Sequence, residues 1–381
     1  MDNCQQEDQK QYLNNQDMIE EFVLHDQKYF GQYIQNVEDF QSLISSFRSD
    51  MKENRIFITG FPFDEGTYRN GGRIGAEQAP KSFRDLLQKE KLYTDINFEK
   101  CLKIYDLGDI PKQKYPDEDE EEHEHIRARQ LTLEEAHLWQ RQKLGQILDY
   151  NLQFDNRSVI FAIGGSNDQS YCNVQSIFDC FPDKKIGVIN IDSQFGVSQL
   201  KGNISHSGSP FRLMLENPVF KKNQSKFIQF GVKGSNCCQE DYEYLKSKGV
   251  QIYWLEKDIR RYLLNQNQVD SQNDNKDSLI TQAGQLFEEV LNKLQQECDK
   301  IFISLDVESI NAKFCPGVSS PSVTGGLQDL EVVEIVQAAA RCKKLIMMDL
   351  SEYNPAVESQ RTGRFIVNLF YQFSNIFSQQ I

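Results

Sequence analysis

Two acidic residues, Asp306 and Glu308, follow the apolar run Ile301–Leu305. The run is typical of a strand buried on both faces of a sheet, because it is apolar without alternation. Side chains on a strand alternate between its faces, so we expect both carboxylates to point to the same side. Acids at the carboxyl end of a buried strand can supply the oxygen ligands of a metal site. The alternative interpretation is an acid pair in a solvated loop.

Three further apolar runs end in polar residues of the same kind. Asn167 follows one of them, Asp192, Gln194 and Gly196 follow the next, and Glu352 follows the last. The carboxyl ends of parallel strands lie along one edge of a sheet. We therefore expect these residues to converge with the acid pair on a single cleft.

Strands and helices are predicted to alternate along most of the chain. This alternation predicts an α/β fold with three α/β/α layers and one doubly wound, mostly parallel sheet. The predicted strands are Arg55–Gly60, Leu102–Leu107, Val159–Ile163, Lys185–Ile191, Phe227–Gly231, Ile252–Leu255, Lys300–Leu305 and Lys344–Met348. The predicted helices are Pro80–Leu87, Leu131–Leu152, Gln169–Phe178, Glu240–Lys248, Leu279–Cys298, Leu330–Ala340 and Thr362–Phe373.

The chain is predicted to be a single domain over residues 51–381, preceded by a polar extension over 1–50. Apolar residues at helical spacing predict amphipathic helices within Asp17–Phe47, including Tyr33 and Ile34. An acidic insertion is expected near 113–128 and a low-complexity surface loop near 265–277.

The composition excludes several classes of protein. A net charge of −14 argues against nucleic acid or an anionic membrane surface as a partner. The chain has no apolar run near the roughly 18 residues that a membrane-spanning helix needs. Its polar start is unlike a secretory or transit peptide. Nine cysteines, scattered and odd in number, fit reduced thiols, so we expect a cytoplasmic protein.

Several motifs in chain order resemble the ureohydrolases, which include arginase, agmatinase and, with the greatest similarity, formimidoylglutamase. The resemblance extends from about Ile56 to Tyr371. It rests on Gly60–Pro62, Asn70–Arg73, Ser207–Arg212, Gln229–Val232, Pro316–Pro321 and Glu352–Pro355. It implies an arginase-like fold and hydrolysis of linear C–N bonds in guanidino or formimino substrates.

The resemblance also implies two manganese ions held by two histidines and four aspartates. In this chain an amide occupies each histidine position, glycine replaces one aspartate and glutamate replaces another. The six positions are Asn167, Asp192, Gln194, Gly196, Asp306 and Glu308. None of the five histidines falls on them. Three carboxylates without imidazole suit Mg²⁺, Ca²⁺ or weakly held Mn²⁺ better than a tight binuclear centre.

We therefore expect a degenerate ureohydrolase that has lost the binuclear site and catalysis and acts as a ligand-binding or assembly protein. The alternative is an active hydrolase with one metal ion. Without an ion, the three acids are expected to repel one another. We therefore expect raised pKa values, or a cationic side chain or a water network that fills the gap.

The resemblance places three residues near a guanidino or formimino ligand. Glu352 aligns with an acid that helps to place the cationic end of the substrate, and Asn70 lies in the glycine-rich loop. Arg73, in the same loop, either binds a substrate carboxylate or anchors the loop. Protein partners are expected at the extension or the acidic insertion, and a homo-oligomer is possible because relatives commonly form one.

Overall fold

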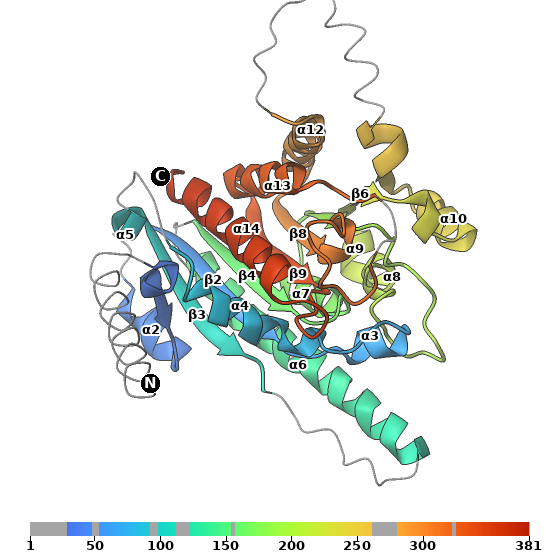
Figure 1. Cartoon of the computed structure of the whole chain (residues 1–381), viewed down its shortest axis with the longest axis horizontal. Helices are drawn as coiled ribbons and strands as arrows, with labels where there is room; N and C mark the ends of the chain where they lie inside the picture. The colour runs from blue at the N-terminus through green and yellow to red at the C-terminus, as the bar shows by residue number, and fades with distance from the viewer. Residues whose placement is uncertain are drawn as a thin grey trace, which may run out of the picture.

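The computed structural model describes residues 29–47, 53–91, 98–111, 122–153, 157–260, 280–321 and 325–380. Within them, nine strands form one sheet in the order β1-β3-β2-β4-β9-β8-β5-β6-β7, and all neighbours are parallel (Figure 1). The strands are β1 (Ile34–Asn36), β2 (Asn54–Phe61), β3 (Leu102–Asp109), β4 (Ser158–Gly164), β5 (Ile186–Ile191), β6 (Lys226–Val232), β7 (Gln251–Trp254), β8 (Lys300–Asp306) and β9 (Leu345–Ser351).

Helices cover both faces of this sheet. The longer ones are α2 (Phe40–Ser46), α4 (Ala79–Leu87), α6 (Glu122–Gln153), α7 (Gln169–Cys180), α8 (Pro210–Glu216), α10 (Gln239–Ser247), α12 (Gln282–Glu297), α13 (Asp329–Arg341) and α14 (Gln360–Ser378). Shorter ones are α3 (Glu65–Arg69), α5 (Phe98–Cys101), α9 (Pro218–Lys222), η1 (Phe30–Tyr33), η2 (Ala76–Gln78), η3 (Gly234–Asn236), η4 (Leu255–Ile259) and η6 (Val307–Ser309). The three-layer α/β/α prediction is confirmed.

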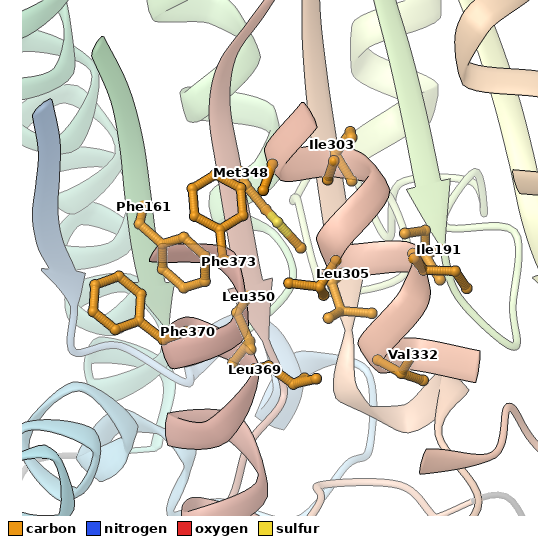
Figure 2. Packing of buried hydrophobic residues seen from close by; sticks show 14 of the residues in the cluster. Phe161, Ile191, Ile303, Leu305, Val332, Met348, Leu350, Leu369, Phe370 and Phe373 are labelled. Carbon is orange, nitrogen blue, oxygen red and sulfur yellow. The ribbon is translucent and has the colours of Figure 1, made fainter. Parts of the chain in front are cut away.

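The central strands are apolar throughout because each of their faces packs against a helix layer. Along β8, Ile303 and Leu305 face the layer of α12, α13 and α14, whereas Phe302 faces the layer of α6, α7 and α8. Figure 2 shows the first of these layers, with Phe370 and Phe373 of α14 packed on Phe161 of β4. Burial on both faces explains why these strands lack polar alternation.

All eight predicted strands and all seven predicted helices are present. Most of their ends shift by a few residues, but α6 begins at Glu122, nine residues before the predicted start at Leu131. Five strands and α-helices lie outside those predictions, namely β1, α3, α5, α8 and α9, as do the short helices η2, η3, η4 and η6. The helical prediction was wrong at Ile34, which begins β1 and pairs with Ile104 of β3. In a strand of only three residues, the spacing of apolar side chains cannot be distinguished from the spacing in a helix.

Parts of the expected domain division lie outside the described residues, including 1–28, 112–121 and the low-complexity loop near 265–277. Within the expected extension, β1 joins the sheet and Phe30 is buried in the core. The division at residue 50 stays a prediction. Among the described residues, no helix has the length and apolar character needed to cross a membrane. The eight cysteines described are free thiols.

Candidate ligand-binding cleft

Seven of the nine predicted site residues lie at or follow the carboxyl ends of four strands that are adjacent in the sheet, in the order β4-β9-β8-β5. They surround a cavity of ≈ 340 Å³, at the small end of the size range for ligand pockets. The cavity is lined by Thr67, Asn70, Gly71, Gly72, Asn167, Asp192, Gln194, Phe195, Gly196, Ser198, Ser207, Gly208, Asn236, Cys237, Cys238, Asp241, Asp306, Glu308, Ser320 and Glu352.

Asp306 and Glu308 both line the cavity, but strand alternation is not the cause. The strand β8 ends at Asp306, and Glu308 belongs to the short turn η6. The Asp306 carboxylate caps this turn by accepting a hydrogen bond from the Glu308 backbone N–H at 2.8 Å. The Glu308 carboxylate accepts from the Ser320 backbone N–H at 2.5 Å. The turn therefore aims both acids into the cleft.

The loop after β5 brings Asp192, Gln194 and Gly196 to the same cavity. Asp192 accepts a hydrogen bond from the Gln194 backbone N–H at 2.9 Å, and the Gln194 amide lies 3.4 Å from Glu308. Gly196 has a φ of +61°. A Cβ atom there would lie 2.8 Å from a ring carbon of Phe211, so the backbone at this position is adapted to glycine.

Asn167 turns its side-chain oxygen into the protein. This oxygen accepts hydrogen bonds from the hydroxyls of Ser170 at 3.1 Å and Ser351 at 3.3 Å. The backbone N–H of Asn167 donates to Glu352 at 2.8 Å. Because a metal ligand needs an available oxygen, the hydrogen bonds around Asn167 favour a structural role for its side chain.

Glu352, which lines the cleft, is held in an unusual backbone conformation. Its φ is +64°, in the left-handed region that residues other than glycine seldom adopt. The Thr67 hydroxyl donates to its carboxylate at 2.9 Å, and its own N–H donates to the Gly165 carbonyl at 2.7 Å. Strain of this kind persists only where the surrounding contacts impose it, and it is common at ligand-binding sites.

The four acids of the cleft floor are almost fully buried, and their pKa values are raised. Burial raises the pKa of Asp192 to about 6 and that of Glu352 to about 7. Burial also raises the pKa values of Asp306 and Glu308 well above their ordinary values, and repulsion from neighbouring carboxylates adds to the effect. The expected repulsion is therefore present, and a bound cation would relieve it.

Of the two loop residues expected near a ligand, Asn70 lines the cavity and Arg73 does not. The Arg73 guanidinium donates to the backbone carbonyls of Ser319 at 3.1 Å and Val318 at 2.6 Å. These contacts tie the glycine-rich loop to the loop after η6, as a structural anchor would. The lining residues Ser198, Cys238 and Asp241 were not expected from the sequence, because no strand end or motif marks them.

The residues fit a pair of metal ions poorly. Within the described part of the chain, no three His, Cys, Asp or Glu side chains are grouped so that they could hold a metal ion. Gly196 offers no side chain, and the oxygen of Asn167 is engaged by two hydroxyls. The acids that remain at the family positions, Asp192, Asp306 and Glu308, line the same cavity.

Comparisons with known proteins agree with the fold. A formimidoylglutamase from Staphylococcus aureus is 24% identical over 331 residues, which cover 87% of this chain and 89% of the relative. Trypanosoma cruzi formiminoglutamase, in a crystal structure with Mn²⁺, is 31% identical in sequence to this chain. The alignment covers 90% of this chain and 98% of the Trypanosoma chain, with a TM-score of 0.68. Formimidoylglutamase from Bacillus subtilis, 19% identical over 93% of both chains, shares the fold at a TM-score of 0.67.

The match extends to a family model as well as to individual proteins. The model of the arginase family matches residues 54–374, which span every strand of the sheet except β1. The expected relationship to ureohydrolases is thus confirmed. This chain belongs to the arginase family.

Proposed function

We propose that this chain binds a small organic cation in its cleft and does not carry out the two-manganese hydrolysis associated with the arginase family. The observation that carries the proposal is Gly196, whose left-handed backbone and contact with Phe211 leave no room for a metal-binding side chain. The hydrogen bonds that engage the Asn167 oxygen support the same conclusion. Two of the six family ligand positions are thereby lost.

The electrostatics of the cleft support a cationic ligand. Four buried carboxyl groups with raised pKa values share one cavity, and each becomes easier to ionise when a positive charge enters. We expect Glu352, which lines the cleft, to receive the cationic end of a guanidino or formimino group, as the family resemblance implies. Thr67 holds the Glu352 carboxylate in position.

A second candidate function is hydrolysis of a formimino or guanidino substrate with one metal ion. It is favoured by Asp192, Asp306 and Glu308 around one cavity, and by the relatives named as formimidoylglutamases. A bound divalent ion would supply an activated water near neutral pH. The three acids would hold that ion, and Glu352 would orient the substrate.

We also propose which segments contact protein partners, where in the cell the protein acts and how it assembles. The segment before residue 50 and the acidic insertion are candidate surfaces for protein partners in an assembly role. A cytoplasmic location and a symmetric homo-oligomer also remain predictions. Analytical ultracentrifugation of the full chain tests the oligomeric state.

Metal analysis combined with an activity assay decides between the two functions. Purified protein, dialysed against manganese and then desalted, is expected to contain fewer than two metal ions per chain by mass spectrometry. It is expected to release no formamide, urea or ammonia from formimidoylglutamate or guanidino compounds. Two manganese ions per chain would overturn the first proposal, and turnover with one ion would establish the second.

A further inference from the structure

A second cavity lies at the opposite end of the strands from the cleft. Its volume is ≈ 420 Å³, within the size range of ligand pockets, and it shares no lining residue with the cleft. Its lining comes from the amino ends of β6 and β7, the turn before β7, the carboxyl end of α8, and the helices α9 and α12. The cavity is therefore a site separate from the one at the carboxyl ends of the strands.

The walls of this second cavity are apolar. Phe220 of α9, Phe227 of β6 and Val290 of α12 line it and are 8%, 5% and 5% exposed. By contrast, Phe302 and Ile303 in the central strand β8 are fully buried. Because the wall residues line an open cavity, a bound molecule with an apolar body would remove their remaining surface from water.

The charged residues of this cavity are mostly cationic. Lys226, Lys248 and Lys293 line it together with a single acid, Glu297. Over the whole chain, acids outnumber Lys and Arg by 56 to 42. The charge at this cavity is thus opposite in sign to that of the chain and of the cleft, and it favours an anion.

The three lysines are weakly engaged within the protein. The Lys226 ammonium lies 3.9 Å from the Glu297 carboxylate, and both side chains are partly exposed. The Lys248 ammonium lies 5.2 Å from the centre of the Tyr244 ring. Lys293 forms no ion pair or hydrogen bond with the part of the chain that the structure describes. Exposed contacts of this kind contribute little, so the ammonium groups are available to an anionic ligand.

We propose that this cavity binds a small organic anion with an apolar body, of the aromatic carboxylate class. The carboxylate lies among Lys226, Lys248 and Lys293, and the apolar body packs against the walls. Few polar groups that fix orientation, set in an apolar lining, are typical of small-molecule sites. The site does not depend on the proposed function of the cleft, so the failure of either proposal leaves the other intact.

The test is a ligand-observed NMR titration of the full-length protein with indole-3-propionate. Its uncharged amide and propionate, which lacks the aromatic body, are the comparison ligands. Indole-3-propionate is expected to bind at least tenfold more tightly than propionate and about tenfold more tightly than the amide. The double variant Lys248→Gln with Lys293→Gln should lose most of the preference for the carboxylate over the amide, with the amide bound as before.

Glu297→Gln should act in the opposite direction. It removes the only acid among the lining residues and releases Lys226, so the carboxylate should bind about two- to fivefold more tightly, the effect of one exposed charge. The matched control is Lys246→Gln, an exposed lysine of α10 that does not line the cavity, and it should leave all three affinities unchanged.

Several outcomes would overturn the proposal. Absence of indole-3-propionate binding at millimolar concentration would do so, as would equal affinities for the carboxylate and the amide. Propionate binding as tightly as indole-3-propionate would refute the role of the apolar walls. An unchanged preference in the double lysine variant would place the binding site elsewhere. All the substituted side chains are exposed, and a thermal melt of each variant checks that its fold is retained.

Discussion

Gly196 and Phe211 are packed so closely that a single added carbon at Gly196 would lie 2.8 Å from the Phe211 ring. Gly196 occupies a position at which the family resemblance implies an aspartate ligand. Phe211 is the second residue of α8, after Pro210, and is fully buried against Phe227 of β6. The glycine is therefore a structural requirement of this chain as well as a missing ligand.

Restoring the aspartate is expected to destabilise the protein. Gly196→Asp places a side chain at a φ of +61° and against Phe211, and we expect a loss of about 2–5 kcal/mol in the free energy of unfolding. The control is Gly249→Asp, where φ is +68° and a Cβ has no neighbour within 4 Å. Chemical denaturation should show a smaller loss of stability for the control, because its only cost is a side chain on a backbone with positive φ. Equal losses in both variants would show that Phe211 does not matter.

The stability of the protein should respond to pH through Glu352. Its pKa is raised from 4.5 to about 7 by burial, so the folded state holds this proton more tightly than the unfolded state. The stability gained from this tighter proton binding is complete below about pH 4.5 and is lost as pH rises through about 7. Glu352→Gln removes this pH dependence. The difference in the free energy of unfolding between the variant and the wild type should therefore shift by up to about 3 kcal/mol in favour of the variant from pH 5 to pH 8.

Urea denaturation at the two pH values measures this gain. The control is Glu358→Gln, because hydrogen bonds from Thr362 and other backbone groups lower the pKa of Glu358 despite some burial. Glu358 is then ionised in both states throughout this window, and its replacement should change stability equally at both pH values. A similar pH trend in the two variants would argue against a raised pKa for Glu352.

Binding of a cation should release protons. A positive charge in the cleft lowers the pKa values of Asp192, at about 6, and Glu352, at about 7, so protonated acids ionise on binding near neutral pH. Titrations of a guanidino compound in two buffers with different ionisation enthalpies should give different binding enthalpies. The difference should shrink at higher pH as these acids ionise in the free protein. Identical enthalpies in both buffers at neutral pH would contradict the buried-acid account.

His137 of α6 should stabilise the loop next to Asn167. Its Nε2 atom lies 2.5 Å from the carboxylate of Asp168, which is fully buried. Burial raises the pKa of Asp168, but the hydrogen bond from His137 lowers it, and the resulting pKa is below its usual value. The stability from this lowered pKa is present above the unfolded-state pKa and is lost as pH falls.

His137→Ala leaves a buried carboxylate without this partner, and we expect a loss of about 2–4 kcal/mol in the free energy of unfolding near neutral pH. The loss should become smaller below about pH 4, where Asp168 is protonated in the unfolded chain. Leu138→Ala, at a half-exposed neighbour on the same helix, controls for truncation and should cost less than about 1 kcal/mol. A loss that does not change with pH would rule out the ionic part of the contact.

The sequence alone was sufficient to predict the three layers and the order of the main strands and helices. Buried parallel strands such as β4 and β8 are continuous apolar runs, and the helices between them have a strong periodic pattern. Short elements were not predictable in this way. The edge strand β1 and the helix α8 obtain most of their stability from packing against β3 and β6, which a local pattern does not record.

The sequence alone also determined which residue types stand at the strand ends, and hence that Asn167, Gln194 and Gly196 differ from the ligand set implied by the family resemblance. Only the tertiary structure decided what those residues do. It showed that the Asn167 oxygen is used by two serines and that Arg73 anchors a loop. It also brought Asp241 of α10 into the same cavity as Asp306 of β8. Strand-end positions follow from local pattern and sheet rules, whereas the partners of a side chain depend on segments that fold against it from elsewhere in the chain.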